Sequence, residues 1–215
     1  MLLRFLRAYV WNSETRQQRC PAFRSALFAV PINRRIFTVE NIRICEMKHV
    51  EAKDLRDNFF EAIGKEWMLV TAGTKEHFNT MTASWGGVGF LWGKPVAFIF
   101  IRPERYTFEF LENSDSFTLS FLGEENKGIH KVCGSKSGRE VDKVKETGLM
   151  PFASDSGNVL FEQARLSLEC RKLYSDMLKA DGFIDKSLVE RWYGESVGNF
   201  HRMYIGEITD AWLRE

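Results

Sequence analysis

Two segments of the chain combine residue types that could hold a polar ring or a phosphate. The first, Asn79–Gly87, places hydroxyl side chains and glycines at the end of a predicted strand. Hydroxyl groups and free backbone N–H groups at such a position can hydrogen-bond a polar ring edge or a phosphate. Taken alone, the same composition is also typical of a strand face that only meets water.

The second segment, Arg102–Thr107, follows the apolar run Val96–Ile101 directly. Arg102 and Arg105 stand just before a predicted helix, and two guanidinium groups beside a helix N-terminus form a plausible site for a dianion. The hydroxyl of Thr107 could add a further contact. The alternative is an ordinary helix start that carries surface arginines.

A third segment, Cys133–Glu140, is rich in glycine and in cationic side chains and includes Lys136. Such a composition suits a mobile loop near an anion, and it suits a plain charged loop equally well. The spacing of its glycines and lysine does not fit the phosphate loop G-x-x-x-x-G-K-[ST].

Several familiar catalytic patterns are absent from the sequence. It contains no G-x-G-x-x-G that opens a helix after a strand, which argues against a dinucleotide-binding Rossmann fold. It also contains no G-x-S-x-G, no H-E-x-x-H and no C-x-x-C. His130 and Cys133 lie one helical turn apart, but two ligands are weak support for a metal, so we expect no metal site.

Composition and charge narrow the class of protein. The 215 residues are 44% hydrophobic and 27% charged, with 18 Phe and 6 Trp that can fill a core or wall a flat ligand. Residues 47–215 carry a net charge of −4, which argues against a nucleic-acid partner. No apolar run approaches the roughly 18–20 residues of a membrane span, and the four widely spaced cysteines indicate a reduced, cytoplasmic protein.

Residues 1–46 differ from the rest of the chain, because they hold eight Arg, three Glu and no Lys. Three interpretations stay open: a start site that truly lies at Met47, an Arg-rich transit presequence, or a genuine disordered or docking extension. We therefore treat 1–46 as a non-native or disordered extension and base the fold on 47–215.

Hydrophobic periodicity predicts the elements that must position the three segments. Helices are expected at 54–63, 106–111, 127–133, 139–146 and 186–192, and strands at 67–71, 80–85, 96–101, 117–122, 160–177 and 200–212. Gly64 is expected to end the first helix, 117–122 to keep one polar face, and Gly206 to mark a bulge or a close approach. Strands, then a helical interruption, then strands again favour an antiparallel barrel with helical insertions.

Together, five blocks resemble the flavin reductase-like family, and in particular its flavoredoxin-type branch. In chain order they are NTMTASWGGVGFLWGKP, IRPERYT, FTLSFL, CGSKSGREVDK and YIGEI. The resemblance covers roughly Met47 to Trp212. It implies a mainly β fold with helical insertions, a six-stranded antiparallel split β-barrel over 47–215, a homodimer, and FMN bound near the subunit interface.

The resemblance also implies roles for individual residues. The strand end would lie along the flavin ring, Asn79 would support it, the arginine segment would hold the phosphate, and Lys136 would reach the flavin or the substrate. His201 and Tyr204 are weaker candidates for the outer face of the flavin, and no residue is assigned a catalytic role. The expected cofactor-binding residues are Asn79, Met81, Thr82, Ala83, Ser84, Trp85, Arg102, Arg105, Tyr106, Thr107 and Lys136.

The function implied by the resemblance is redox chemistry, in which the cofactor carries the electrons and the protein supplies binding and orientation. NAD(P)H would reduce FMN, and the electrons would pass to a small-molecule or protein acceptor. Two alternatives stay open: an FMN-containing electron carrier without NAD(P)H turnover, and a non-enzymatic flavin- or haem-binding protein.

Overall fold

The fold is an antiparallel sheet that curls into a split barrel. The computed structural model describes residues 47–194 and 199–214, so the extension 1–46 lies outside the described residues. One eight-stranded sheet has the order β3-β2-β6-β9-β10-β5-β4, with β1 also paired to β10, and β7 and β8 form a separate hairpin. The strands are β1 Met47–Val50, β2 Met68–Thr74, β3 His77–Ala83, β4 Gly86–Leu91, β5 Lys94–Ile101, β6 Ser116–Phe121, β7 Pro151–Ala153, β8 Val159–Phe161, β9 Leu166–Met177 and β10 Arg202–Arg214.

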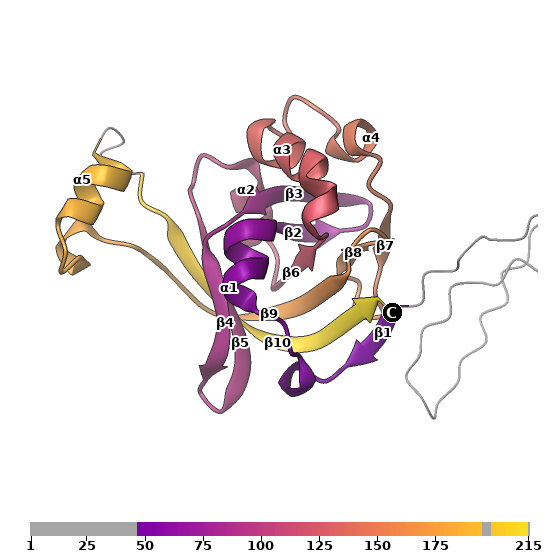
Figure 1. Ribbon diagram of the computed structural model, residues 1–215. Coiled ribbons are helices and arrows are strands. Elements are labelled where there is room, and N and C mark those ends of the chain that lie inside the picture. Colours follow the sequence, from indigo (N-terminus) through magenta and orange to yellow (C-terminus); the bar gives the residue numbers. More distant parts are fainter. Residues whose placement is uncertain (1–46, 195–198, 215) are drawn as a thin grey trace, which may run out of the picture.

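Short helices cover the barrel, and one stands away from it (Figure 1). In Figure 1, α3 and α4 lie above β3. Helix α5 belongs to an arm that projects from the sheet and is formed by the chain segment that connects β9 to β10. The helices are α1 Phe59–Glu61, α2 Tyr106–Glu112, α3 Lys127–Ser135, α4 Lys143–Thr147 and α5 Ser187–Tyr193, with 3₁₀ turns η1 Ala52–Asp54, η3 Glu124–Asn126 and η4 Ala180–Gly182 and a π-helical turn η2 Ala62–Glu66. The expected antiparallel barrel with helical insertions is therefore confirmed, although the main sheet has two strands more than the six implied.

The alternation of side chains along β2 explains why the protein has two apolar clusters. Met68 and Val70 point into the barrel and join the main core. Leu69, between them, points outward and joins a smaller cluster with Cys133 and Phe161. Because successive side chains of a strand face opposite sides of the sheet, a continuous apolar run requires cover on both faces.

Strand β6 has the expected polar face at 117–122, formed by Thr118 and Ser120, and this face is buried like the apolar one. Thr118 and Ser120 are buried because the β7–β8 hairpin and the neighbouring strand cover them. The hydroxyl of Thr118 donates to the carbonyl of Val159 at 2.8 Å, and that of Ser120 lies 3.3 Å from the Ser167 hydroxyl. Alternating hydroxyl residues therefore mark a buried face whose polar groups are paired within the protein.

The first predicted helix is wrong in its bounds. The chain from Leu55 to Asn58 has no regular secondary structure, and helical structure begins at Phe59, where the Asn58 side chain accepts a hydrogen bond from the Phe60 N–H at 3.2 Å. It continues past Gly64 to Glu66 as a π-helical turn. Phe60, placed on the apolar face by periodicity, is 93% exposed. A polar cap thus outweighed the apolar spacing as the start signal.

The strand predicted at 80–85 ends earlier, and a new strand follows it at once. Strand β3 ends at Ala83, Ser84 and Trp85 form the link, and β4 begins at Gly86. Gly86 has φ of +156°, and a Cβ there would lie 2.5 Å from the Phe98 carbonyl oxygen. The glycine therefore permits a sharp change of direction that leaves Trp85 at the surface.

Gly206 fulfils both expectations placed on it. The pairing of β10 with β9 shifts register between Ile205 and Gly206, which marks a β-bulge. A Cβ on Gly206 would lie 2.8 Å from Cε1 of Phe117 and 3.0 Å from the Cβ of Cys170. Because Phe117 and Cys170 are buried in the main core, they have little room to yield.

We expect the substitution Gly206→Ala to destabilise the fold by roughly 1–3 kcal/mol, because the added methyl group overpacks the core against Phe117. Urea unfolding gives the free energy directly. Gly89→Ala in β4 is the matched control, since nothing lies within 4 Å of the added Cβ. An equal stability for the two variants would contradict the close-approach explanation.

Candidate functional site

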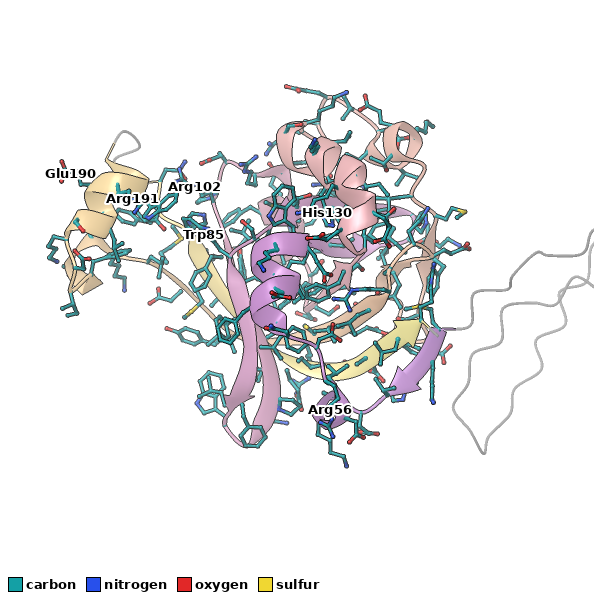
Figure 2. The ribbon with its side chains drawn as sticks, viewed as in Figure 1. Arg56, Trp85, Arg102, His130, Glu190 and Arg191 are labelled. Atoms are coloured by element: carbon teal, nitrogen blue, oxygen red, sulfur yellow. The ribbon has the colours of Figure 1, made fainter. Side chains whose placement is uncertain are left out.

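The end of β3 exposes only part of the segment predicted to line a ring. Met81 and Ala83 point into the main core and are buried, whereas Ser84 and Trp85 are exposed at the link to β4. Trp85 and Arg102 lie on the side of the barrel that is next to the α5 arm (Figure 2). A ligand at this strand end would therefore meet Ser84, Trp85 and the backbone.

Thr82 is occupied by contacts with α3. Its hydroxyl donates to the His130 carbonyl at 2.7 Å and lies 3.3 Å from Nδ1 of the same residue. Gly134 allows this approach, since a Cβ there would lie 3.3 Å from the Cβ of Thr82. The side chain of Thr82 thus fixes α3 against β3.

A buried hydrogen bond joins the two predicted segments. Nδ2 of Asn79 in β3 donates to Oγ1 of Thr107 in α2 at 2.7 Å, and both side chains are buried. The loop after α3 rests on the same amide, because a Cβ on Gly138 would lie 2.1 Å from Oδ1 of Asn79. Thr107 therefore stabilises the start of α2 from inside the protein and does not present its hydroxyl to solvent.

Two arginines stand before α2 without an acidic partner. Nη2 of Arg102 donates to the Trp192 carbonyl at 2.8 Å, and its guanidinium lies 5.3 Å from the centre of the Tyr193 ring. Arg105 is exposed, and its Nη1 donates to the Gly134 carbonyl at 3.3 Å. Within the described ranges, no carboxylate forms an ion pair with either arginine, so both retain their charge for an anion.

Aromatic rings gather beside these arginines. The ring of Trp85 lies 4.9 Å from that of His201 and 5.0 Å, edge-on, from that of Trp192 in α5. The Tyr193 hydroxyl lies 2.8 Å from Nδ1 of His201. Burial lowers the pKa of His201 to about 4, and the charges of Arg102 and Arg105 act in the same direction. His201 is therefore neutral at pH 7, next to two fixed positive charges.

Two other predicted residues point elsewhere. Nζ of Lys136 forms an ion pair with Oε2 of Glu146 in α4 at 2.6 Å, which holds the side chain against that helix. Tyr204 is fully buried and donates its hydroxyl to Oε1 of Glu112 at 2.7 Å. Of the weaker candidates, only His201 joins the ring cluster.

Lys143 is a residue that the sequence did not single out. It begins α4, is 7% exposed, and donates from Nζ to the Thr80 carbonyl at 2.8 Å and to the Cys133 carbonyl at 2.9 Å. Together with Asn79 and Tyr106 it lines a cavity of about 510 Å³. In the sequence it closes the block CGSKSGREVDK and follows Asp142, whose side chain caps α4 by accepting from the Lys145 N–H at 3.1 Å.

His130 packs behind the strand end. It is 1% exposed, its Nε2 has no hydrogen-bond partner among the described residues, and its ring lies 6.2 Å from that of Trp67. Burial and, to a smaller extent, the charge of Lys127 lower the pKa of His130 to about 4. The imidazole is therefore neutral at pH 7 and supports Thr82 from the side opposite the exposed link.

The described part of the chain contains neither a metal-binding cluster nor a membrane-spanning helix. No group of three or more His, Cys, Asp or Glu residues there could hold a metal ion. No helix within 47–194 or 199–214 is long and apolar enough to cross a membrane.

The chain is similar to a known protein family and to several solved structures. A family model described as a flavin reductase like domain matches residues 60–215. No curated protein matches the chain. Among solved structures, an FMN-binding protein from Thermus thermophilus with bound p-hydroxybenzaldehyde is 23% identical at a TM-score of 0.56, and the match covers 79% of this chain and 83% of that one.

Two further structures share the fold. A flavoredoxin from Methanosarcina acetivorans is 22% identical at a TM-score of 0.53, over 70% of this chain and 69% of that one. An NADH:FAD oxidoreductase from Streptomyces globisporus is 18% identical at a TM-score of 0.52, over 70% of this chain and 78% of that one. At these identities the likeness establishes the fold alone.

We expect the buried, neutral His130 to make the protein less stable in acid. Between the unfolded pKa of about 6.5 and the folded value of about 4, the unfolded chain binds a proton that the folded protein does not. The contribution of His130 to the free energy of unfolding should therefore be fully present above pH 6.5. It should decrease as the pH drops, by up to about 3 kcal/mol.

Urea unfolding at about pH 7 and about pH 4.5 measures the effect, and His130→Leu should reduce the pH dependence. His77→Gln, at an exposed position, serves as the control and should retain it. His201 contributes in the same direction and remains in both variants. A pH dependence of His130→Leu equal to that of the wild type would rule out this assignment.

Proposed function

The chain belongs to the flavin reductase-like family, and from that membership we propose that it is an FMN-binding oxidoreductase. In this proposal NAD(P)H donates electrons to bound FMN, and a small-molecule or protein acceptor receives them. A homodimer, with the flavin near its interface, and a cytoplasmic location remain predictions of the sequence resemblance and of the cysteine spacing.

The observation that carries the proposal is a pair of arginines that have no acidic partner among the described residues and that lie beside exposed indole rings. The backbone N–H of Arg105 donates to the Arg102 carbonyl at 3.1 Å, so both arginines stand on one turn before α2, and their charges help to lower the pKa of His201. His201 in turn contacts Trp85. A ligand with a phosphate at one end and a flat ring at the other satisfies both features, and FMN is such a ligand.

The residues divide the binding between them. Arg102 and Arg105 would hold the phosphate, and Ser84, Trp85 and the backbone of the β3 end would border the ring. FMN, when bound, would supply hydride and single-electron chemistry that no side chain of this chain can supply. The protein would contribute orientation, cover from water and fixed charge, for which the unpaired arginines and the neutral His201 are suited.

The names of similar structures support two versions of this activity. One neighbour is an NADH:FAD oxidoreductase, which favours NAD(P)H as the donor, and another is a flavoredoxin, which favours an electron carrier. The visible absorption spectrum of the purified full chain, before and after anaerobic addition of NAD(P)H, separates them. Flavin absorbance that bleaches with NAD(P)H, together with steady-state NAD(P)H oxidation when FMN is added, is the expected result.

Other spectra would lead to other conclusions. A yellow protein that resists NAD(P)H but accepts electrons from a reduced ferredoxin would be a carrier. A haem-type Soret band, or no affinity for FMN or riboflavin, would refute the proposal.

We expect Arg102→Ala and Arg105→Ala to weaken FMN far more than riboflavin, because only FMN has the phosphate. Each lost charge-assisted contact should cost roughly tenfold or more in FMN affinity. Fluorescence titration with the two flavins measures the ratio.

Arg56→Ala is the matched control for these variants. Arg56 is exposed at the opposite end of the barrel (Figure 2), and its guanidinium reaches only the carbonyls of Lys53 and Leu55. Equal losses of FMN and riboflavin in the arginine variants would refute the phosphate assignment.

A further inference from the structure

The side chain of Tyr193 joins the α5 arm to the candidate site. Tyr193 is the last residue of α5, and it is only 4% exposed although the arm projects from the barrel (Figure 1). Its ring stacks on that of Phe200 with 4.5 Å between the centres, and the Phe183 ring lies 5.9 Å away. Packing inside the arm therefore fixes the position of the Tyr193 ring, and the hydroxyl group is free to serve another purpose.

The hydroxyl of Tyr193 contacts His201 in two ways. Its oxygen lies 2.8 Å from Nδ1 of His201, and the main chain of His201 also forms a hydrogen bond to it. Burial raises the pKa of Tyr193, while the charge of Arg102 and this main-chain hydrogen bond oppose the rise. The phenol therefore keeps its proton at neutral pH. Because a main-chain N–H can only donate, the phenol oxygen accepts from it and gives its own proton to Nδ1.

This arrangement determines which ring nitrogen of His201 carries the proton. The imidazole is neutral at pH 7, since its pKa is lowered to about 4, and Nδ1 accepts from Tyr193, so the single ring proton lies on Nε2. The other tautomer would leave the phenol proton without an acceptor among the described residues. Nε2 itself has no partner within 47–194 or 199–214, and the ring lies 4.9 Å from that of Trp85.

A neutral donor differs from the two cations beside it in what it can bind. Burial and the charges of Arg102 and Arg105 keep His201 from being protonated, and Tyr193 is the titratable group in direct contact with it. The arginines suit an anion, whereas a neutral imidazole N–H suits a carbonyl oxygen or an unprotonated ring nitrogen. The edge of a flavin ring offers both kinds of acceptor.

We propose that Tyr193 is a positioning residue of the flavin site: its hydroxyl fixes the tautomer of His201 in which Nε2–H donates to an acceptor atom at the edge of the bound flavin ring. The inference rests on the proposed binding of FMN. It gives the α5 arm a part in recognising the ring, separate from the part of the arginines in recognising the phosphate. Because FMN and riboflavin share the same ring, loss of the Tyr193 hydroxyl must affect both flavins by the same factor.

The tautomer of His201 can be measured in the full chain without any ligand. Two-bond ¹H–¹⁵N correlation spectra distinguish a protonated ring nitrogen from an unprotonated one, and we expect a protonated Nε2 in the wild type at pH 7. Tyr193→Phe keeps the ring and removes the hydroxyl, so both tautomers should be populated in this variant. A wild-type proton on Nδ1, or an unchanged spectrum of His201 in Tyr193→Phe, would overturn the proposal.

Fluorescence titration with the two flavins measures the effect on binding. We expect Tyr193→Phe to bind FMN and riboflavin more weakly by the same factor, roughly three- to tenfold, because one oriented hydrogen bond is lost. Tyr174→Phe is the matched control, since Tyr174 is 44% exposed on β9 and its hydroxyl reaches only Oδ2 of Asp176, at 3.5 Å. It should bind both flavins like the wild type.

A double variant tests whether Tyr193 acts through His201. His201→Gln removes the imidazole that Tyr193 orients, so adding Tyr193→Phe to it should weaken neither flavin further. Additive losses would overturn the proposal, and so would a loss confined to FMN, which would place the effect at the phosphate. If the wild type bound neither flavin, the proposed function itself would fail. If the wild type bound both flavins and Tyr193→Phe bound them equally well, only the inference about Tyr193 would fail.

Discussion

The arrangement of the site depends on one buried hydrogen bond, from the amide of Asn79 to the hydroxyl of Thr107. Strand β3 carries the exposed link with Trp85, and α2 follows directly on the two arginines. The bond therefore sets where the rings lie relative to the cations. The loop that holds Gly138 rests on the same amide. Because a buried amide that loses its partner costs about 1–3 kcal/mol, this junction has little freedom to shift.

Much of the fold was predictable because the local preferences of its residues agree with the contacts that these residues make in the folded protein. Residues 96–101 are apolar throughout, and they form a strand between two neighbours, β10 and β4. Gly206 was predictable because an isolated glycine inside a strand pattern indicates a bulge or a close approach, and a Cβ there would indeed meet Phe117. The start of the first helix was not, since Asn58 caps it from a position that apolar spacing ignores. The polar face of β6 was expected, but its burial was not, because its cover, the β7–β8 hairpin, comes some 30 residues later in the chain.

The candidate site also contains residues that the sequence indicated and residues that it did not. Trp85, Arg102 and Arg105 were expected from the sequence because their types and order carry chemical meaning by themselves, and their role in binding stays a prediction. Lys143 was missed because a lysine in a charged stretch gives no sign that it will be buried. Conversely, Lys136 and Thr107 have suitable chemistry, but Glu146 and Asn79 engage their side chains. Whether a polar group faces a ligand or another part of the protein depends on tertiary contacts that local sequence does not encode.

The contact between Arg102 and the α5 arm has a thermodynamic consequence. The guanidinium that faces the site also donates to the Trp192 carbonyl and lies over the Tyr193 ring. An anion that changes how tightly Arg102 is held must therefore change how tightly the arm is held. Linkage makes the effect reciprocal: whatever docks on or displaces the arm alters anion affinity by the same factor. If Arg102 binds an anion as proposed, the arm and the site form one coupled equilibrium.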